Sequence, residues 1–160
     1  MSPRAACRLE TLGFPDVYDY VAGKADWLAH GLRGEGENAD RPRALDVAAH
    51  DVVTCSLHEP VGDVRTRAAA SRYGFAFVVS GDGILLGRLG RAALHADGNT
   101  SAEELMEPGP STIRADATLE PLSERMRAHD LTGLPITTPG GRLLGLLRRD
   151  DLEAALRSTR

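Results

Sequence analysis

The side chains that most often act as nucleophiles or metal ligands are few and scattered in this chain. The two cysteines, Cys7 and Cys55, are far apart, and no histidine is spaced with a cysteine to hold a metal. The five histidines are His30, His50, His58, His95 and His129. No export signal opens the sequence, so we expect free thiols in a cytoplasmic protein. We predict no metal site, no required cofactor and no catalytic residue, and hence no enzyme.

A denser group of charges, Arg148-Arg149-Asp150-Asp151, stands between an apolar run and a predicted helix. Acidic residues are favoured in the first turn of any helix, which alone accounts for Asp150 and Asp151. Arg148 is equally well explained as a solvated charge. A binding role for these four residues therefore depends on the strands and helices that position them.

The whole chain has the size and composition of a small soluble globular protein. It has 160 residues, with 19 Lys+Arg against 23 Asp+Glu and a formal net charge of −4. This balance gives no basic surface for nucleic acid. No apolar run of about 18 residues predicts a membrane helix. We therefore expect no nucleic-acid partner and no membrane contact.

The most informative element pattern is an internal repeat with a shift of 58 positions and no gap. Between residues 53–94 and 111–152, 10 of 42 positions are identical, where average composition gives about two or three. Apolar positions match where identity fails, as Val64 does with Leu122. Two copies too small to bury a core alone predict a pseudo-two-fold pair with its function in the crevice between them.

Each copy predicts the order strand-helix-strand-strand-helix, which is an α/β (α+β) fold with two β-α-β-β-α repeats. In the second copy we predict strands at 111–113, 134–138 and 142–147 and helices at 119–129 and 150–156; the first-copy equivalents are 52–55, 75–80 and 83–89, and 60–73 and 91–95. A capping box at 101–104 predicts a further short helix.

Residues 1–30 predict helix, strand and helix, with the strand at 16–21 because apolar and polar residues alternate there. Residues 31–43 are rich in glycine and predict a linker. The predicted organisation is a segment at 1–32, a linker at 33–43, a first repeat at 44–98 and a second repeat at 99–160.

The repeats resemble a tandem pair of cystathionine-beta-synthase (CBS) domains, also called a Bateman module. The resemblance rests on Thr132-Gly133-Leu134-Pro135-Ile136 and on the run from Gly140 to Leu152, and it covers residues 44–157. It implies a regulatory module that binds AMP, ADP, ATP or S-adenosylmethionine between the copies, and that associates into a homodimer through its helices.

The resemblance also implies binding residues. The family signature after the last strand is Ser or Thr, two variable residues, then Asp, and in the second copy it falls on Arg148 and Asp151. Asp151 would accept hydrogen bonds from the ribose diol, while Arg148 replaces the phosphate-binding hydroxyl. Further contacts implied are Thr112 on the first strand and Leu134 and Pro135 on the adenine wall. Strand propensity also explains Thr112, and Pro135 can simply edge a strand.

The first copy has Gly90 and Ala93 at the signature positions, so we expect one competent site per chain. An interaction module that has lost ligand binding is the first alternative. The second follows from residues 3–27, which resemble the C-terminal end of a rhodanese-like domain without its catalytic cysteine loop. On that interpretation the chain is a truncated sulfurtransferase. Cys7 falls inside the predicted helix, where we expect a small buried apolar residue.

Overall fold

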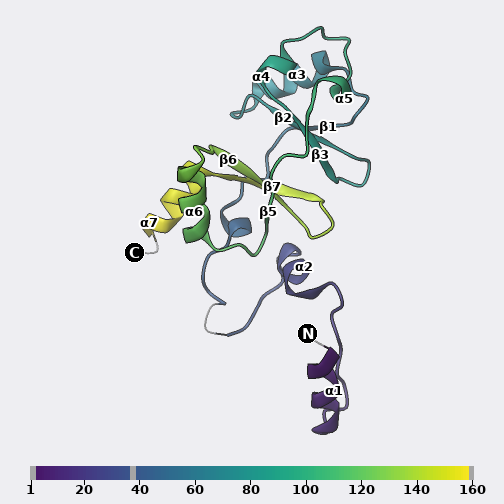
Figure 1. Cartoon of the computed structure of the whole chain (residues 1–160), viewed down its shortest axis with the longest axis vertical. Coiled ribbons are helices and arrows are strands. Elements are labelled where there is room, and N and C mark those ends of the chain that lie inside the picture. Colours follow the sequence, from purple (N-terminus) through teal and green to yellow (C-terminus); the bar gives the residue numbers. More distant parts are fainter. Residues whose placement is uncertain (1–2, 37–38, 159–160) are drawn as a thin grey trace.

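The computed structural model describes residues 3–36 and 39–158 and contains two small mixed sheets, each covered by its own helices (Figure 1). The first repeat comprises β1 (Thr54–Cys55), α3 (Val61–Ala70), β2 (Ala76–Val79), β3 (Leu85–Leu89) and α4 (Arg91–Leu94). The second comprises β5 (Ile113–Arg114), α6 (Leu119–Ala128), β6 (Gly133–Thr137), β7 (Leu143–Arg148) and α7 (Arg149–Ser158). The predicted α/β fold with two β-α-β-β-α repeats is confirmed.

The two sheets have the same topology, because equivalent positions of the two repeats form the strand hydrogen bonds and the buried core. β1 runs parallel to β2 and β5 parallel to β6, while β2–β3 and β6–β7 are antiparallel hairpins. Each hairpin turns through a glycine with positive φ, Gly83 or Gly141. The apolar side chains that match across the repeat form two buried cores; equivalent pairs include Val61 and Leu119, Val64 and Leu122, Val78 and Ile136, and Leu94 and Leu152.

The segment that leads into each repeat packs on the other repeat. The 3₁₀ helix η1 (Ala44–Val47) lies against the second core, and Ala49 bridges to Leu146. Correspondingly, α5 (Ala102–Leu105) packs on the first core, and β4 (Glu107–Pro108) extends the first sheet beside β3. The hydrogen bond from Ala44 N to Ala117 O recurs 58 residues later, from Ala102 N to Glu59 O. The two repeats therefore share their cores by exchanging these segments.

A pair of backbone hydrogen bonds lies on the pseudo-two-fold axis between the hairpins. Leu85 N donates to Gly141 O at 3.0 Å, and Leu143 N donates to Gly83 O at 2.9 Å. These bonds are each other's equivalents under the 58-residue shift, and they flank the bridge between Ile84 and Arg142. Ile84 and Arg142 are equivalent positions of the two repeats, so their bridge pairs a position with its own equivalent. The sequence repeat is therefore also a pseudo-two-fold symmetry of the structure.

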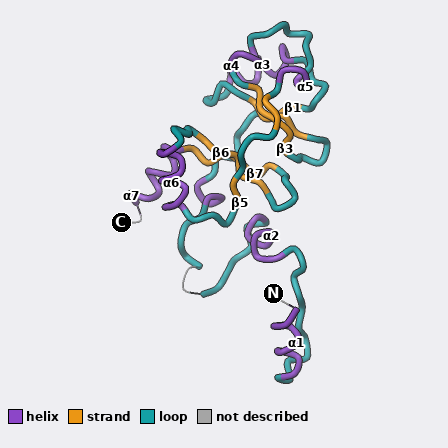
Figure 2. The backbone as a smooth tube through the Cα atoms, viewed as in Figure 1, coloured by secondary structure: helices purple, strands orange, loops and turns teal. Residues whose placement is uncertain are grey.

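The N-terminal segment departs from its predictions. α1 (Pro3–Thr11) and α2 (Gly23–Ala29) form, but the strand predicted at 16–21 is wrong: residues 16–20 have no regular secondary structure, and position 21 lies in a turn. Figure 2 shows this stretch as loop. A strand needs a neighbour for its hydrogen bonds, and an alternating pattern alone supplies none.

The predicted burial of Cys7 is also wrong, since its side chain is exposed on α1. α1 lies at the far end of the molecule from both cores (Figure 1), so no apolar surface covers it. Nearer the repeats, side chains of the segment make specific contacts. Trp27 donates from Nε1 to Arg33 O at 2.8 Å and meets the Tyr20 ring edge-on at 5.4 Å. Ala29 reaches the second core.

Candidate functional site

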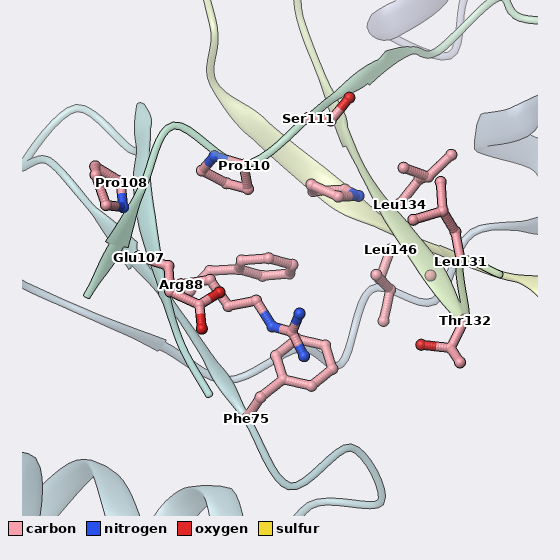
Figure 3. A pocket seen from close by; sticks show the side chains of 13 residues that line it. Phe75, Arg88, Glu107, Pro108, Pro110, Ser111, Leu131, Thr132, Leu134 and Leu146 are labelled. Carbon is pink, nitrogen blue, oxygen red and sulfur yellow. The ribbon is translucent and has the colours of Figure 1, made fainter. Parts of the chain in front are cut away.

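The strongest candidate site is a cavity of about 260 Å³ in the crevice between the repeats (Figure 3). The first repeat supplies one wall with Phe75, Phe77 and Arg88, and the second supplies the other with Leu134, Pro135 and Leu146. The connection between the repeats contributes Glu107, Pro108, Pro110 and Ser111. A molecule bound here would touch both repeats at once.

An arginine stacked on an aromatic ring dominates the first-repeat wall. The Arg88 guanidinium carbon lies 4.7 Å from the centre of the Phe75 ring, and Phe75 meets Phe77 edge-on at 5.2 Å. Glu107 is the cross-strand partner of Arg88, so it brings a carboxylate to the same wall. The wall therefore offers a flat cation, an aromatic face and an anion within one small cavity.

The two repeats differ most where they face this crevice. Phe75 and Phe77 correspond, 58 residues later, to Gly133 and Pro135. A Cβ added to Gly133 would lie 3.1 Å from Leu146 Cδ1, so even a methyl group there presses on the wall. The bulky aromatic side chains of the crevice thus come from the first repeat, and the smaller Gly133 and Pro135 of the second repeat leave room opposite them.

The structure divides the predicted binding residues into three places. Leu134 and Pro135 are buried in β6 and line the cavity. Leu134 also belongs to the second core, so its packing role is present without a ligand. Thr112 is exposed beside β5 and is not on the cavity wall, where its neighbour Ser111 lies instead.

Arg148 lies in an adjoining hollow that shares Phe75, Gly133 and Leu146 with the cavity. Its guanidinium pairs with Asp150 Oδ2 at 3.1 Å and stands 5.9 Å from the centre of the Tyr73 ring. Asp151 occupies the first turn of α7, where its carboxylate suits the helix dipole. It is half-buried and lines neither hollow.

Among the residues that the structure describes, no cysteine and no cluster of metal ligands lines the cavity. The Cys55 thiol is buried, and burial raises its pKa to about 11, with the nearby Glu59 carboxylate adding to the shift. A thiol with so high a pKa is protonated and inert near neutral pH. Among residues 3–36 and 39–158 no group of three or more His, Cys, Asp or Glu side chains could hold a metal ion.

Several wall residues were not predicted from the sequence, namely Phe75, Arg88, Glu107, Ser111, Thr132 and Leu146. A signal for the aromatic wall does exist. Tyr73, Phe75 and Phe77 alternate with small residues, in a chain with 3 Tyr and 3 Phe in all. The period of two places their side chains on one face of a strand. Glu107 gave no such signal, because the two-residue strand β4 that carries it contains a proline and has no alternating pattern.

Comparisons with known proteins agree with this geometry. The family model of the CBS domain matches residues 102–158. The structure of CBSX2 in complex with AMP superposes with a TM-score of 0.64 at 20% identity, over 74% of this chain and 98% of that one. A CBS domain pair from a transcriptional regulator of Streptococcus pneumoniae gives 0.65 at 18% identity, over 72% and 99%. The fold is that of a pair of CBS domains.

A further similarity is to magnesium transporters. The chain is 34% identical over 79 residues to the magnesium transporter MgtE of Thermus thermophilus, which is 49% of this chain and 18% of that protein. The cytosolic domain of the Mg²⁺ channel MgtE in complex with ATP superposes with a TM-score of 0.58 at 28% identity, over 69% of this chain and 51% of the other. The chain thus spans a small part of that relative. No described helix is both long and apolar enough to cross a bilayer.

Proposed function

We propose that this chain is a non-catalytic regulatory module that binds one adenosine-containing ligand in the crevice between its repeats. The observation that carries the proposal is the cavity whose opposite walls come from different repeats. A ligand there changes the relative stability of arrangements of the two repeats, which is what a regulatory ligand must do. The neighbours that hold AMP and ATP support this ligand class.

The chemistry of the walls suits the parts of a nucleotide. Leu134, Pro135 and Leu146 form an apolar surface against which a flat purine can pack. The guanidinium groups of Arg88 and Arg148 lie on the cavity and in the adjoining hollow, within one continuous crevice, and can pair with phosphates. The Asp150 carboxylate that now pairs with Arg148 would compete with such a phosphate.

Two carboxylates are candidates for the ribose. Asp151 is the choice that the CBS resemblance implies, whereas Glu107 is the carboxylate on the cavity wall. Glu107 also approaches the first repeat's signature position: its Oε1 lies 3.6 Å from where a Cβ on Gly90 would stand. Either group can accept two hydrogen bonds from a diol, and they can be separated by substitution.

Calorimetric titration of the full chain with AMP, ADP, ATP and S-adenosylmethionine tests the proposal. Binding of about one ligand per chain is expected. Arg148→Ala should raise the Kd for AMP, ADP and ATP by about tenfold, which is the effect of losing one charge-assisted hydrogen bond. Whichever of Glu107→Gln and Asp151→Asn weakens binding similarly identifies the ribose carboxylate. Asp82→Asn, on the exposed hairpin turn, is the control with the same change of charge. No heat and no thermal shift with any of the four ligands would refute the proposal.

The alternative is an interaction module that has lost ligand binding. Gly90 and Ala93 remove the hydroxyl and the carboxylate from the first repeat, and Arg148 is paired within the chain. These observations are compatible with an empty crevice as well as with a single site, and the titration decides between them. The truncated sulfurtransferase has no comparable support, because Cys7 is the fifth residue of α1 rather than at its start.

We further propose that the module acts in the cytoplasm as a homodimer. The CBS resemblance implies association through the helices, and α3, α4, α6 and α7 provide two helix-covered surfaces apart from the crevice (Figure 1). The N-terminal segment preceding the repeats is the natural element for a ligand-bound crevice to move, because Ala29 of α2 packs on the second core.

A further inference from the structure

The groove between the two helices of each repeat is filled differently in the two copies. In the first repeat, the Arg65 side chain of α3 reaches the end of α4, where its Nε donates to Leu94 O and its Nη2 donates to Ala96 O at 2.6 Å. The 58-residue shift places Ser123 of α6 at the position of Arg65. The second repeat therefore lacks the guanidinium group that the first repeat holds at this place.

The backbone also closes this groove in the first repeat and leaves it open in the second. After α4 the chain returns across α3, where Gly62 N donates to Gly98 O at 3.0 Å. In the second repeat α7 continues as a helix to Ser158, and the equivalent positions are Glu120 and Leu156. Both of these residues line a hollow of about 530 Å³ between α6 and α7. This volume is within the range of small-molecule sites.

A buried hydroxyl without a hydrogen-bond partner lines this hollow. Ser123 is 4% exposed, and its Oγ makes no hydrogen bond among the residues that the structure describes. A buried hydroxyl that has lost its bonds to water costs free energy unless another group replaces them. A hydrogen-bond donor that enters the hollow would give this oxygen a partner.

Carboxylates surround the hydroxyl and give the hollow a negative charge. Glu120, Glu124 and Glu153 line it together with Arg127 and Arg157. Arg127 Nε pairs with Glu153 Oε1 at 3.0 Å, and no described ion pair involves Glu120 or Glu124. These two carboxylates stand against the single guanidinium of Arg157, so one negative charge is left over. A ligand with one positive charge would neutralise it.

We propose that the hollow between α6 and α7 binds a small alkylguanidinium, which is a guanidinium group on a short carbon chain. The planar cation has five N–H donors and no acceptor, so it pairs with the carboxylates of Glu120 and Glu124 and donates to Ser123 Oγ. Its carbon chain lies against Leu156. The acidic side chains do not form a metal site, because no group of three or more possible ligands is placed to hold a metal ion among the described residues. This site is separate from the nucleotide crevice, and the proposal does not depend on nucleotide binding.

Calorimetric titration of the full chain with n-butylguanidinium tests the proposal. Binding of one molecule per chain with a Kd below about 1 mM is expected. The comparison ligand is n-butylammonium, which has the same carbon chain and the same charge but lacks the planar fork of donors; it is expected to bind about tenfold more weakly. Equal affinities would overturn the proposal, since they would show only a general attraction of cations to a chain with a net charge of −4.

Substitutions locate the site. Glu120→Gln and Glu124→Gln are each expected to raise the Kd for butylguanidinium about tenfold. Glu10→Gln makes the same charge change on the exposed surface of α1 and should leave the Kd unchanged. Ser123→Ala is expected to raise the Kd about threefold while the melting temperature of the free chain stays equal or rises, because the substitution removes an unsatisfied buried hydroxyl. A residue with only a structural role would not lower affinity without lowering stability.

Ser123→Arg restores the residue of the first repeat, and it is expected to abolish butylguanidinium binding by filling the hollow. Circular dichroism melting verifies that each variant is folded. Retained binding in S123R, equal losses of affinity in E10Q and E124Q, or no heat at millimolar ligand would overturn the proposal. Tighter binding of N-acetylarginine methylamide than of butylguanidinium would overturn the assignment to a free small molecule, because it would assign the site to an arginine of a peptide. The Kd for AMP is expected to be unchanged in E124Q, so the two titrations succeed or fail separately.

Discussion

The two cysteines of the chain have opposite environments, and burial is the main difference between them. Cys55 lies in β1, the parallel neighbour of β2, with its Sγ 3.7 Å from the Phe77 carbonyl oxygen, and its pKa is raised to about 11. At pH 7 roughly one such thiol in ten thousand is ionised. Cys7 is exposed on α1. The buried residue is therefore structural, and any reactivity of the native protein belongs to the exposed one.

We therefore expect one thiol to react in the native chain and two after unfolding. Titration with a chromogenic disulfide at pH 7.5, with and without guanidinium chloride, measures this ratio. Cys7→Ser should reduce the native count to nearly zero, whereas Cys55→Ser should leave it at about one. Rapid reaction of both thiols in the folded chain would show that the first repeat opens easily and is not packed as described.

The glycines at the crossing points explain why some positions cannot diverge between the repeats. Gly87 and Gly145 are equivalent, and the exchanged segment of the other repeat passes over each of them. A Cβ on Gly145 would lie 2.7 Å from Ala49 O, and one on Gly87 would lie 2.5 Å from Met106 Sδ. The obstacle at Gly145 is backbone, so the crossing segment itself would have to shift.

Gly145→Ala is expected to destabilise the fold by about 1–3 kcal/mol, the usual cost of overpacking a tight contact. Alanine is slightly better than glycine within a strand, but that gain is smaller than the steric cost. Gly140→Ala is the control on the same hairpin, because its added Cβ would meet only Thr138 Oγ1 at 3.8 Å. Urea unfolding gives both values. Equal stabilities of the two variants would argue against the close crossing at Ala49.

Most elements were predictable because the repeat displays each of them twice. Both hairpins and all four principal helices of the repeats form where the pattern predicted them, within a few residues. The capping box at 101–104 predicted α5, although the Ser101 hydroxyl donates to the Glu104 carboxylate at 2.7 Å rather than capping the backbone. The strand predicted at 16–21 was wrong, because no described partner strand lies beside it. The strand β4 was missed, because it forms only through its pairing with β3.

The site was less predictable than the fold, because a crevice depends on which residues meet across the axis. Leu134 and Pro135 lie on its wall, and their contact with a ligand stays a prediction. Thr112 lies off the wall, and Asp151 as a ribose ligand stays a prediction. Arg88 and Glu107 could not be foreseen, since their proximity arises from the pairing of β3 with β4. That pairing joins segments from different repeats and has no local sequence signal.

In the molecule as a whole, the exchange of leading segments makes the two repeats a single folding unit. η1 (44–47) belongs to the second core, and α5 (102–105) belongs to the first. A cut at the predicted boundary between residues 98 and 99 would therefore separate each core from part of its own packing. By contrast, residues 3–36 contribute one small side chain, Ala29, to the second core.

These contributions predict different results for two truncations. A chain of residues 40–160 should keep the unfolding free energy of the full chain to within about 1 kcal/mol, since little apolar area is lost. A chain of residues 99–160 lacks η1 and the bridge at Ala49, and it exposes the apolar side of α5; it should show no cooperative transition. Adding the 40–98 chain should restore helical circular dichroism, because the exchanged segments can still pair between two chains. Cooperative melting of 99–160 alone would contradict a shared core and would support independent repeats.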